Sequence, residues 1–308
     1  MTLTALELCA GAGGQALGFE RAGFEHEALI DNDGHACVTL RTNRPHWNVI
    51  EADLSRFEVR YWHGVDVVAA GLPCPPFSVA GNQDGAGDDR DLFPVLLRIV
   101  SETAPRAVVV ENVRGLMSRR FDTYRQMVQA RLEAAGFVVH WGVLDAHDYG
   151  TPQHRTRSFL VAVPVGAVFE WPTPDAAGGG TVAGAIKDLM GARGWHGVDA
   201  WAAGAQEPAP TIVGGSRRHG GPDLGPTRAR ETWAKLGVDG RGMADHAPGP
   251  DFCGIPRLTV EMAARLQSFD DGWRFVGGKT QRYRQIGNAL PPSLAAAVAT
   301  AVAQCLNG

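Results

Sequence analysis

Short apolar runs alternate along the first half of the chain with longer segments whose apolar residues recur at helical spacing. One run of a length suited to a buried strand begins at residue 5. Other such runs lie at 27–30, 66–70, 107–110, 137–144 and 158–163. Helical spacing and capping residues predict helices over 15–22, 34–42, 92–102 and 122–135. Buried strands that alternate with helices form mostly parallel sheets, so the pattern predicts an α/β fold.

The pattern changes from Pro164 to about Pro256. Glycine pairs, repeated prolines and little periodicity indicate a separate, loop-rich region. Beyond it, 257–269 reads as a helix capped by Thr259, and 293–304 reads as a helix that is small and apolar on several faces. A helix of that kind must be buried, so we expect it to pack back near the N-terminal glycines.

Composition excludes some classes of protein. The chain has 308 residues and a formal net charge of −4, so any nucleic-acid binding has to rest on local basic patches. Its five cysteines are scattered without CxxC spacing, which argues against a disulfide framework or a zinc site and for a reducing compartment. We also expect no secretion signal and no stretch that approaches the apolar length of a membrane span.

A cysteine flanked by prolines follows the strand predicted at 66–70. The motif reads Gly71-Leu72-Pro73-Cys74-Pro75-Pro76-Phe77-Ser78. Open α/β sheets bind their ligands just past the carboxyl ends of such strands. The two prolines after Cys74 suit the first turn of a helix, where the helix dipole favours the thiolate form of a cysteine. A reactive thiol and a buried structural cysteine both fit this pattern.

The stretch at 7–14 combines a strand end with a glycine-rich loop. Such a loop lets the backbone approach a nucleotide-like ligand closely, although the strict GxGxxG spacing is absent. Asp31 follows the next strand and is placed to accept hydrogen bonds from ribose hydroxyls. Asp53 is a candidate for an adenine amino group. A plain tight turn and an ordinary loop aspartate are the structural alternatives.

Glu111 ends the strand predicted at 107–110, at the same sheet edge as Cys74. A carboxylate there is a candidate proton donor or acceptor, and an ordinary loop acid is the alternative. The segment 81–91 is polar, glycine-rich and without an apolar period. We interpret it as a lid beside the thiol or as a disordered connection.

Gln153, Arg155 and Arg157 alternate before the strand predicted at 158–163. The alternation predicts that the two arginines share one face of an extended segment. Two guanidiniums on one face fit phosphate or base-carbonyl binding, and a solvated edge strand is the alternative. Arg217 and Arg218 lie in a basic cluster among polar loops, which is usually no more than surface.

Taken in order along the chain, these motifs resemble the bacterial DNA (cytosine-5)-methyltransferase family. The matching pieces are the glycine loop at 7–14, Asp31, Asp53, the motif around Cys74, Glu111-Asn112-Val113, Gln153-x-Arg155-x-Arg157, the helix at 257–269 and Gly287-Asn288-Ala289. Only about 165–255, which corresponds to the family's variable target-recognition region, falls outside the match. The chain departs from the family at Glu7 (commonly Asp), Cys9 (usually Phe) and Asn32 (often Trp), so its cofactor pocket is less aromatic.

The resemblance implies a Rossmann-like S-adenosylmethionine-dependent catalytic domain at 1–164, completed by 275–308, and a small loop-rich target-recognition domain at 165–274. It implies that Cys74 is the nucleophile, aided by Glu111, Arg155 and Arg157. The cofactor residues it implies are Cys9, Ala10, Gly11, Gly13, Asp31, Asn32, Asp53, Leu54, Pro73, Leu92, Asn288 and Ala289. The DNA-binding residues it implies are Ser78, Gln153, Arg217 and Arg218.

The implied reaction transfers a methyl group from S-adenosylmethionine to C5 of a flipped-out cytosine in duplex DNA and leaves S-adenosylhomocysteine. The expected protein is a cytoplasmic monomer, with a restriction endonuclease that is genetically linked but not bound. Two alternatives stay open, a tRNA cytosine-5 methyltransferase and a catalytically silent DNA-binding relative. The long glycine- and arginine-containing insert favours DNA over tRNA, and Cys74, Glu111 and the two arginines argue against a silent protein.

Overall fold

The computed structural model describes residues 2–73, 91–214 and 221–308. The chain divides into two compact units. The first comprises Met1–Leu144, Thr156–Thr173 and Ala295–Gly308, and the second comprises Asp145–Arg155 and Pro174–Leu294. These bounds differ from the expected domain limits, because residues 145–155 and 275–294 are grouped with the second unit.

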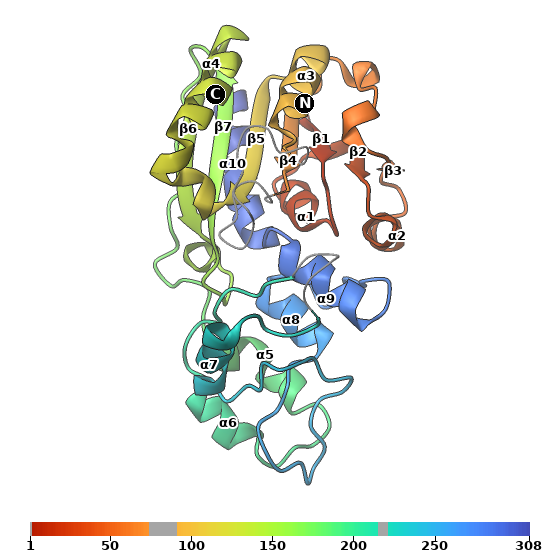
Figure 1. The fold of residues 1–308 in the computed structure, drawn as a ribbon, viewed down its shortest axis with the longest axis vertical. Helices are drawn as coiled ribbons and strands as arrows, with labels where there is room; N and C mark the ends of the chain where they lie inside the picture. The colour runs from red at the N-terminus through yellow and green to blue at the C-terminus, as the bar shows by residue number, and fades with distance from the viewer. Residues whose placement is uncertain (1, 74–90, 215–220) are drawn as a thin grey trace. The chain divides into compact units, whose positions relative to one another are not determined.

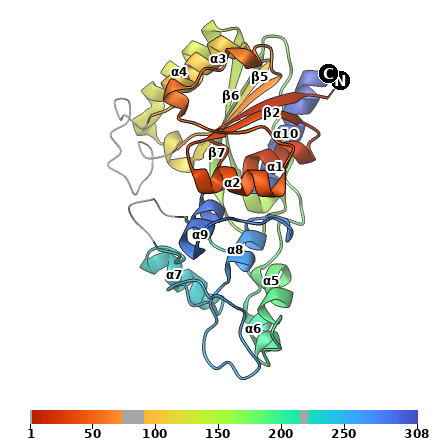
Figure 2. The same cartoon turned by 90° about the vertical axis from the view of Figure 1, so that its right-hand side faces the viewer.

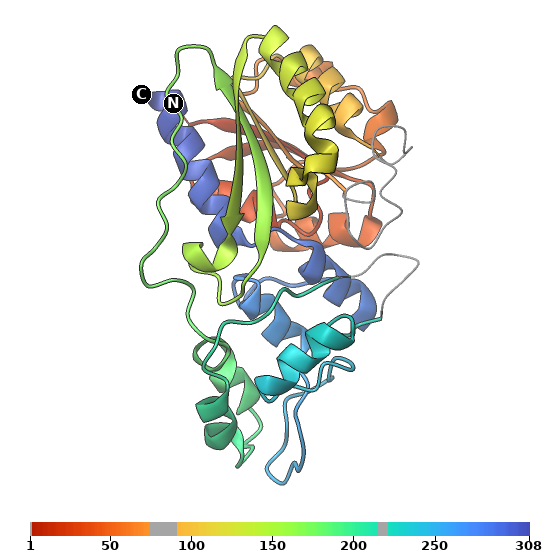
Figure 3. The same ribbon diagram turned by 60° about the vertical axis from the view of Figure 1, so that its left-hand side comes forward.

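A seven-stranded sheet forms the centre of the first unit (Figure 1). The strands are β1 (Thr4–Leu8), β2 (Glu25–Asp31), β3 (Val49–Glu51), β4 (Val67–Gly71), β5 (Ala107–Val113), β6 (Phe137–Asp145) and β7 (Thr156–Pro164). Their order is β3-β2-β1-β4-β5-β7-β6. The first five are parallel, and β7 runs antiparallel to β5 and beside β6 (Figure 3). The predicted α/β fold is therefore confirmed.

The order of the strands reverses at β1, which lies between β2 and β4. Leu8 at the end of β1 is level with Ala70 near the end of β4. The two strands therefore end at the same edge of the sheet. Ligands of open α/β sheets bind in the crevice at such a reversal.

Helices cover both faces of the sheet. On one face, α3 (Phe93–Thr103) and α4 (Asp122–Ala134) lie together (Figure 2). Their apolar residues form one buried cluster with alternate strand residues, including Leu6, Leu8, Val68 and Val110. Successive strand residues point to opposite faces, so Glu7 and Glu111 point toward the other face.

That other face carries α1 (Gly14–Arg21) and α10 (Pro292–Asn307). A Cβ at Gly18 of α1 would lie 2.6 Å from Ala296 N and 2.8 Å from Ala295 C, so the two helices touch at their backbones. The C-terminal helix thus packs beside the helix that follows the glycine loop, as expected. The next helix along the chain is α2 (Gly34–Asn43). Asp33 caps its start, since the Asp33 side chain accepts hydrogen bonds from His35 N and Ala36 N.

The second unit contains α5 (Val182–Met190), α6 (Val198–Gly204), α7 (Thr227–Lys235), α8 (Val260–Leu266) and α9 (Lys279–Asn288). The Thr259 cap is confirmed, since its side chain accepts from Met262 N. The three helices α5 to α7 were not expected in a region read as loops. They are only seven to nine residues long and lie between glycines and prolines, which obscures their periodicity.

One expectation about apolar stretches needs correction. The run Lys279–Asn307 is long and apolar enough to cross a membrane by length and composition alone. However, 56% of its most apolar window is buried inside the structure. A buried core helix passes the same test, and the close packing of α10 on α1 accounts for its small apolar residues.

The contact between α1 and α10 predicts the effect of adding one methyl group. Gly18→Ala forces the two backbones apart, and such overpacking costs about 2 kcal/mol of unfolding free energy. Urea unfolding of the purified protein measures the loss. The control is Gly204→Ala at the end of α6, where a Cβ meets no atom within 4 Å and no loss is expected. A Gly18→Ala protein as stable as the parent would contradict this packing.

Candidate active site

The loop after β1 repeatedly adopts left-handed backbone conformations. Cys9, Gly11 and Gly13 have φ angles of 53°, 53° and 88°. Gly13 donates its N–H to Ala10 O at 3.0 Å and precedes the first residue of α1. A Cβ at Gly11 would meet no atom within 4 Å. Glycine adopts this conformation without strain at positions 11 and 13, whereas Cys9 adopts it with a side chain. The missing side chain at Gly11 leaves the loop accessible to a ligand.

Asp31, at the end of β2, fixes this loop. Its Oδ2 accepts from Gly11 N at 2.7 Å, and its Oδ1 accepts from Asp33 N at 2.7 Å. A carboxylate oxygen can accept more than one hydrogen bond, so a contact with the loop is compatible with a contact to a ribose hydroxyl. Asn32, the next residue, is exposed.

Asp53 and Leu54 begin the turn after β3. Asp53 Oδ1 accepts from Ser55 N at 2.9 Å and from Ser55 Oγ at 2.8 Å, and these bonds lower the pKa of the exposed carboxyl. Leu54 is buried in the core cluster. Burial, followed by the charges of Asp31 and Asp53, raises the pKa of Cys9 far above its usual range, so this thiol stays protonated.

The nucleophile predicted from the sequence lies outside the described residues. So do Ser78, Arg217, Arg218 and residues 81–90 of the predicted lid. The residues that border the first gap are described: Pro73 is exposed, and Leu92 is half-buried against the core cluster just before α3.

Glu111 forms an ion pair with Arg157. The Arg157 Nε lies 2.8 Å from Glu111 Oε1, and both side chains are largely buried, 13% and 12% exposed. Glu111 is level with Gly71 at the end of β4, and Arg157 is level with Val113 of β5. The structure therefore brings these two predicted catalytic residues together beside the strand that leads to Cys74.

Glu7 points to the same face of the sheet from β1. It is fully buried, and neither carboxyl oxygen has a hydrogen-bond partner among the described residues. Burial raises the pKa of Glu7 well above its ordinary value. Burial therefore favours the neutral form of this carboxyl, which avoids an isolated charge in the core.

Two residues of the Gln153-x-Arg155-x-Arg157 motif are structural. Gln153 is fully buried, and it donates to Gln267 Oε1 and accepts from Ile212 N. Arg155 is 2% exposed and donates to Ile212 O at 2.8 Å and to Gly287 O at 2.9 Å. The two arginines differ in their contacts, because Arg157 lies in β7 and pairs with Glu111, whereas Arg155 precedes the strand, which begins at Thr156.

These placements change two assignments. Gln153 has no surface for DNA, and Arg155 links backbone segments within the second unit. Asn288 and Ala289, expected to bind cofactor, also belong to the second unit, at the end of α9. Asn288 is exposed, whereas Ala289 is buried and its carbonyl accepts from Gln267 Nε2 at 2.8 Å.

Comparison with known proteins supports the interpretation of this sheet edge. The family model for C-5 cytosine-specific DNA methylase matches residues 3–218 and 226–304. The chain is 50% identical to type II methyltransferase M.NaeI of Lentzea aerocolonigenes, over 99% of this chain and 76% of that protein. It is 44% identical to type II methyltransferase M.NgoMIV of Neisseria gonorrhoeae, over 99% of both chains.

The chain belongs to the C-5 cytosine-specific DNA methylase family. Solved structures agree on the fold of this methylase. Spodoptera frugiperda DNMT2, as a mutant, superposes with a TM-score of 0.68 at 16% identity, over 98% of this chain and 99% of that one. The Entamoeba histolytica methyltransferase EhMeth superposes with a TM-score of 0.70 at 12% identity, over 99% of each chain.

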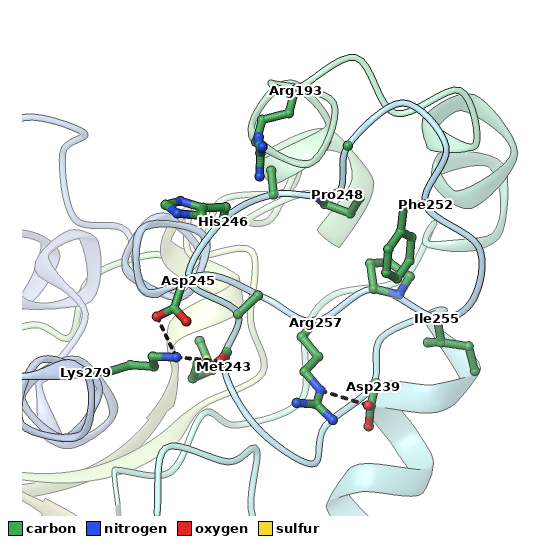
Figure 4. Close-up of a pocket in the computed structure, with 14 residues that line it drawn as sticks. Arg193, Asp239, Met243, Asp245, His246, Pro248, Phe252, Ile255, Arg257 and Lys279 are labelled. Atoms are coloured by element: carbon green, nitrogen blue, oxygen red, sulfur yellow. Dashed lines mark hydrogen bonds and ion pairs between the residues drawn. The ribbon is translucent and has the colours of Figure 1, made fainter.

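The second unit of the methylase also contains a pocket of about 630 Å³ (Figure 4). Two ion pairs line it, Arg257 Nε with Asp239 Oδ2 at 2.9 Å and Lys279 Nζ with Asp245 Oδ1 at 2.7 Å. Hydrogen bonds from the side chains of Arg241 and Arg257 hold the pKa of Asp239 below its usual range. Most of the lining residues lie between Asp239 and Arg257, a stretch of the sequence with little periodicity and no recognised motif, so the sequence did not indicate this pocket.

The structural role of Arg155 predicts a loss of stability. Arg155→Met leaves two carbonyls without their charged donor, which costs about 3 kcal/mol of unfolding free energy. Thermal unfolding measures the change. Arg241→Met, which removes an exposed guanidinium, serves as the control and is expected to shift the midpoint little. An unchanged midpoint combined with lost methyl transfer would instead favour the catalytic role expected from the sequence.

Proposed function

We propose that this methylase transfers a methyl group from S-adenosylmethionine to C5 of a flipped-out cytosine in a specific duplex DNA sequence, through a covalent bond between Cys74 and C6. The observation that carries the proposal is the buried Glu111–Arg157 pair beside the end of β4. An acid and a guanidinium at this place match the groups needed to protonate and hold a pyrimidine. Family membership supports the same reaction.

The reaction requires a nucleophile because C5 of cytosine is itself a poor one. Attack of the Cys74 thiolate on C6 forms a carbon–sulfur bond and moves the electron pair of the C5–C6 double bond toward C5. After methylation, loss of the C5 proton and expulsion of the thiolate restore the ring. A free thiol is only a few per cent ionised at pH 7, so a cysteine nucleophile depends on where it lies. Cys74 follows Pro73 at the sheet edge where such folds bind their ligands.

Glu111 and Arg157 stabilise the charge that develops as sulfur adds. In the proposed complex the Glu111 carboxyl hydrogen-bonds N3 and supplies a proton there. The Arg157 guanidinium holds the cytosine O2, while its Nε keeps the Glu111 carboxyl in place. Because both side chains are largely shielded from water, these interactions are stronger than they would be at the surface.

The residues around the glycine loop fit S-adenosylmethionine, which supplies the methyl group as an electrophile when it is bound. The left-handed positions leave the backbone open at Gly11. We assign Asp31 to the ribose hydroxyls and Asp53 to the adenine amino group of the cofactor. The proposed site also includes Cys9, Ala10, Gly13, Asn32, Leu54, Pro73, Leu92, Asn288 and Ala289. With Cys9 in place of an aromatic residue, the site depends more on hydrogen bonds than on stacking.

The target carbon cannot be reached inside a duplex, so the cytosine has to be flipped out, at a cost of a few kcal/mol. We assign DNA contacts to Ser78, Arg217 and Arg218, and target recognition to the second unit. Arg193, an exposed cation of the pocket there, is a further candidate for a phosphate contact. The proposed protein is a cytoplasmic monomer whose gene accompanies that of a restriction endonuclease.

Cys74→Ser tests the covalent step. The hydroxyl is far less acidic than the thiol, so methyl transfer to DNA should fall to background. The variant should also fail to form a denaturant-resistant complex with duplex DNA that carries 5-fluorocytosine, as judged by electrophoresis. Cys253→Ser, which changes an exposed cysteine of the second unit, should retain both properties. A trapped complex with Cys74→Ser would remove this residue from the mechanism.

Glu111→Gln tests the proton donor. The amide keeps the shape of the side chain but cannot protonate N3, so we expect a loss of at least 100-fold in kcat. Binding of the DNA should persist in a gel-shift assay, because the amide still accepts hydrogen bonds. Turnover at the parent rate would refute the role assigned to Glu111.

Assaying methyl transfer by the parent protein to DNA and to tRNA in parallel separates the two substrate hypotheses.

A further inference from the structure

Gln15, in the first turn of α1, is a buried amide without a partner. The residue is 6% exposed, and neither Oε1 nor Nε2 has a hydrogen-bond partner among the described residues. A buried amide that makes no hydrogen bond costs free energy, so such groups are uncommon in folded proteins. Nothing in the helix explains a glutamine here, since its neighbours Ala16 and Leu17 are buried and apolar.

The amide of Gln15 and the carboxyl of Glu111 approach the same point above Gly71. A Cβ at Gly71 would lie 3.9 Å from Gln15 Oε1, 4.0 Å from Glu111 Oε2 and 3.4 Å from Cys9 O. Gly71 has no side chain, so the space between the amide and the carboxyl stays clear. All these groups belong to the first unit, at the carboxyl ends of β1, β4 and β5.

The chemistry of the two groups is complementary. The oxygen and nitrogen of a glutamine amide are assigned from hydrogen bonds, and a half-turn exchanges them. After that half-turn Nε2, a donor, faces Glu111 Oε2, an acceptor. A hydrogen bond between them, direct or through one water molecule, satisfies the buried amide. Because Arg157 already holds Oε1, the second contact fixes the plane of the carboxyl.

We propose that Gln15 is a positioning residue for Glu111: it donates to Oε2 across Gly71 and orients the carboxyl toward the target base. The inference rests on the proposed role of Glu111. It assigns a part in the reaction to a helix residue outside the motifs recognised in the sequence. It also explains why β4 ends in a residue without a side chain.

Two variants test the inference. Gln15→Leu removes the donor, and Gly71→Ala inserts a methyl group at ordinary contact distance from its neighbours, so it blocks the approach without a clash. Each should slow two reactions about tenfold: methyl transfer, measured as kcat, and the exchange of tritium from C5 of labelled duplex DNA. The exchange needs only addition at C6 and protonation, and it is run without the methyl donor.

The affinity for S-adenosylhomocysteine, measured by calorimetry, should be unchanged in both variants. Gln129→Leu makes the same chemical change on the exposed face of α4 and should leave all three quantities at the parent values. In a Glu111→Gln background, Gln15→Leu should cause no further loss of kcat, because the two residues act through one carboxyl.

Three outcomes would overturn the inference. Parent-like exchange by both variants would exclude a positioning role. Weaker binding of S-adenosylhomocysteine with normal exchange would instead assign Gln15 to the cofactor. Full additivity with Glu111→Gln would show that the two residues act independently. If Gln15→Leu does not fold, Gly71→Ala decides alone. A parent protein that neither methylates DNA nor exchanges the C5 hydrogen would refute the proposed function itself.

Discussion

The ion pair between Glu111 and Arg157 depends on the direction of one strand. Arg157 is the second residue of β7, and Glu111 is near the end of β5. Because β7 runs antiparallel, its beginning lies at the carboxyl edge of the parallel strands, where the loops after β1 and β4 also leave the sheet. In a wholly parallel sheet the same arginine would lie at the opposite edge. The reversal of β7 is therefore what brings a guanidinium to the acid.

The glycine loop depends on a second constraint of the same kind. Asp31 reaches Gly11 because β2 pairs with β1 in parallel, so that both strands end at one edge. The left-handed residues at 9, 11 and 13 then turn the backbone away from the sheet without a side chain at Gly11 in the way. Gly71 on the next strand serves the same purpose, since it keeps the space between α1 and β5 clear. Glycine in the loop after β1 and at the end of β4 therefore leaves room for polar side chains to approach the backbone at this edge.

The sequence predicted the strands other than β3, the order of the motifs and the Thr259 cap, because each of these depends on local periodicity or a single side chain. It could not predict which strand reverses, so the Glu111–Arg157 distance came only from the structure. Nor could it predict that Arg155 is buried and bonded to backbone carbonyls, because its partners Ile212 and Gly287 are far away in the chain. The sequence near Gln15 also gave no indication that its amide lacks a hydrogen-bond partner among the described residues, because the residues around this amide come from three separate strands.

Two cysteines follow strands that are neighbours in the sheet, Cys9 after β1 and Cys74 after β4. Cys9 is half-buried, and burial, followed by the charges of Asp31 and Asp53, raises the pKa of its thiol, so this cysteine stays protonated. Cys74 follows the exposed Pro73 at the end of β4, next to the strand that carries Glu111. In the proposed reaction a sulfur nucleophile beside a bound sulfonium compound has to attack the base and not the methyl group, and the proposed acid on β5 would direct it there by neutralising the charge that only addition to C6 creates.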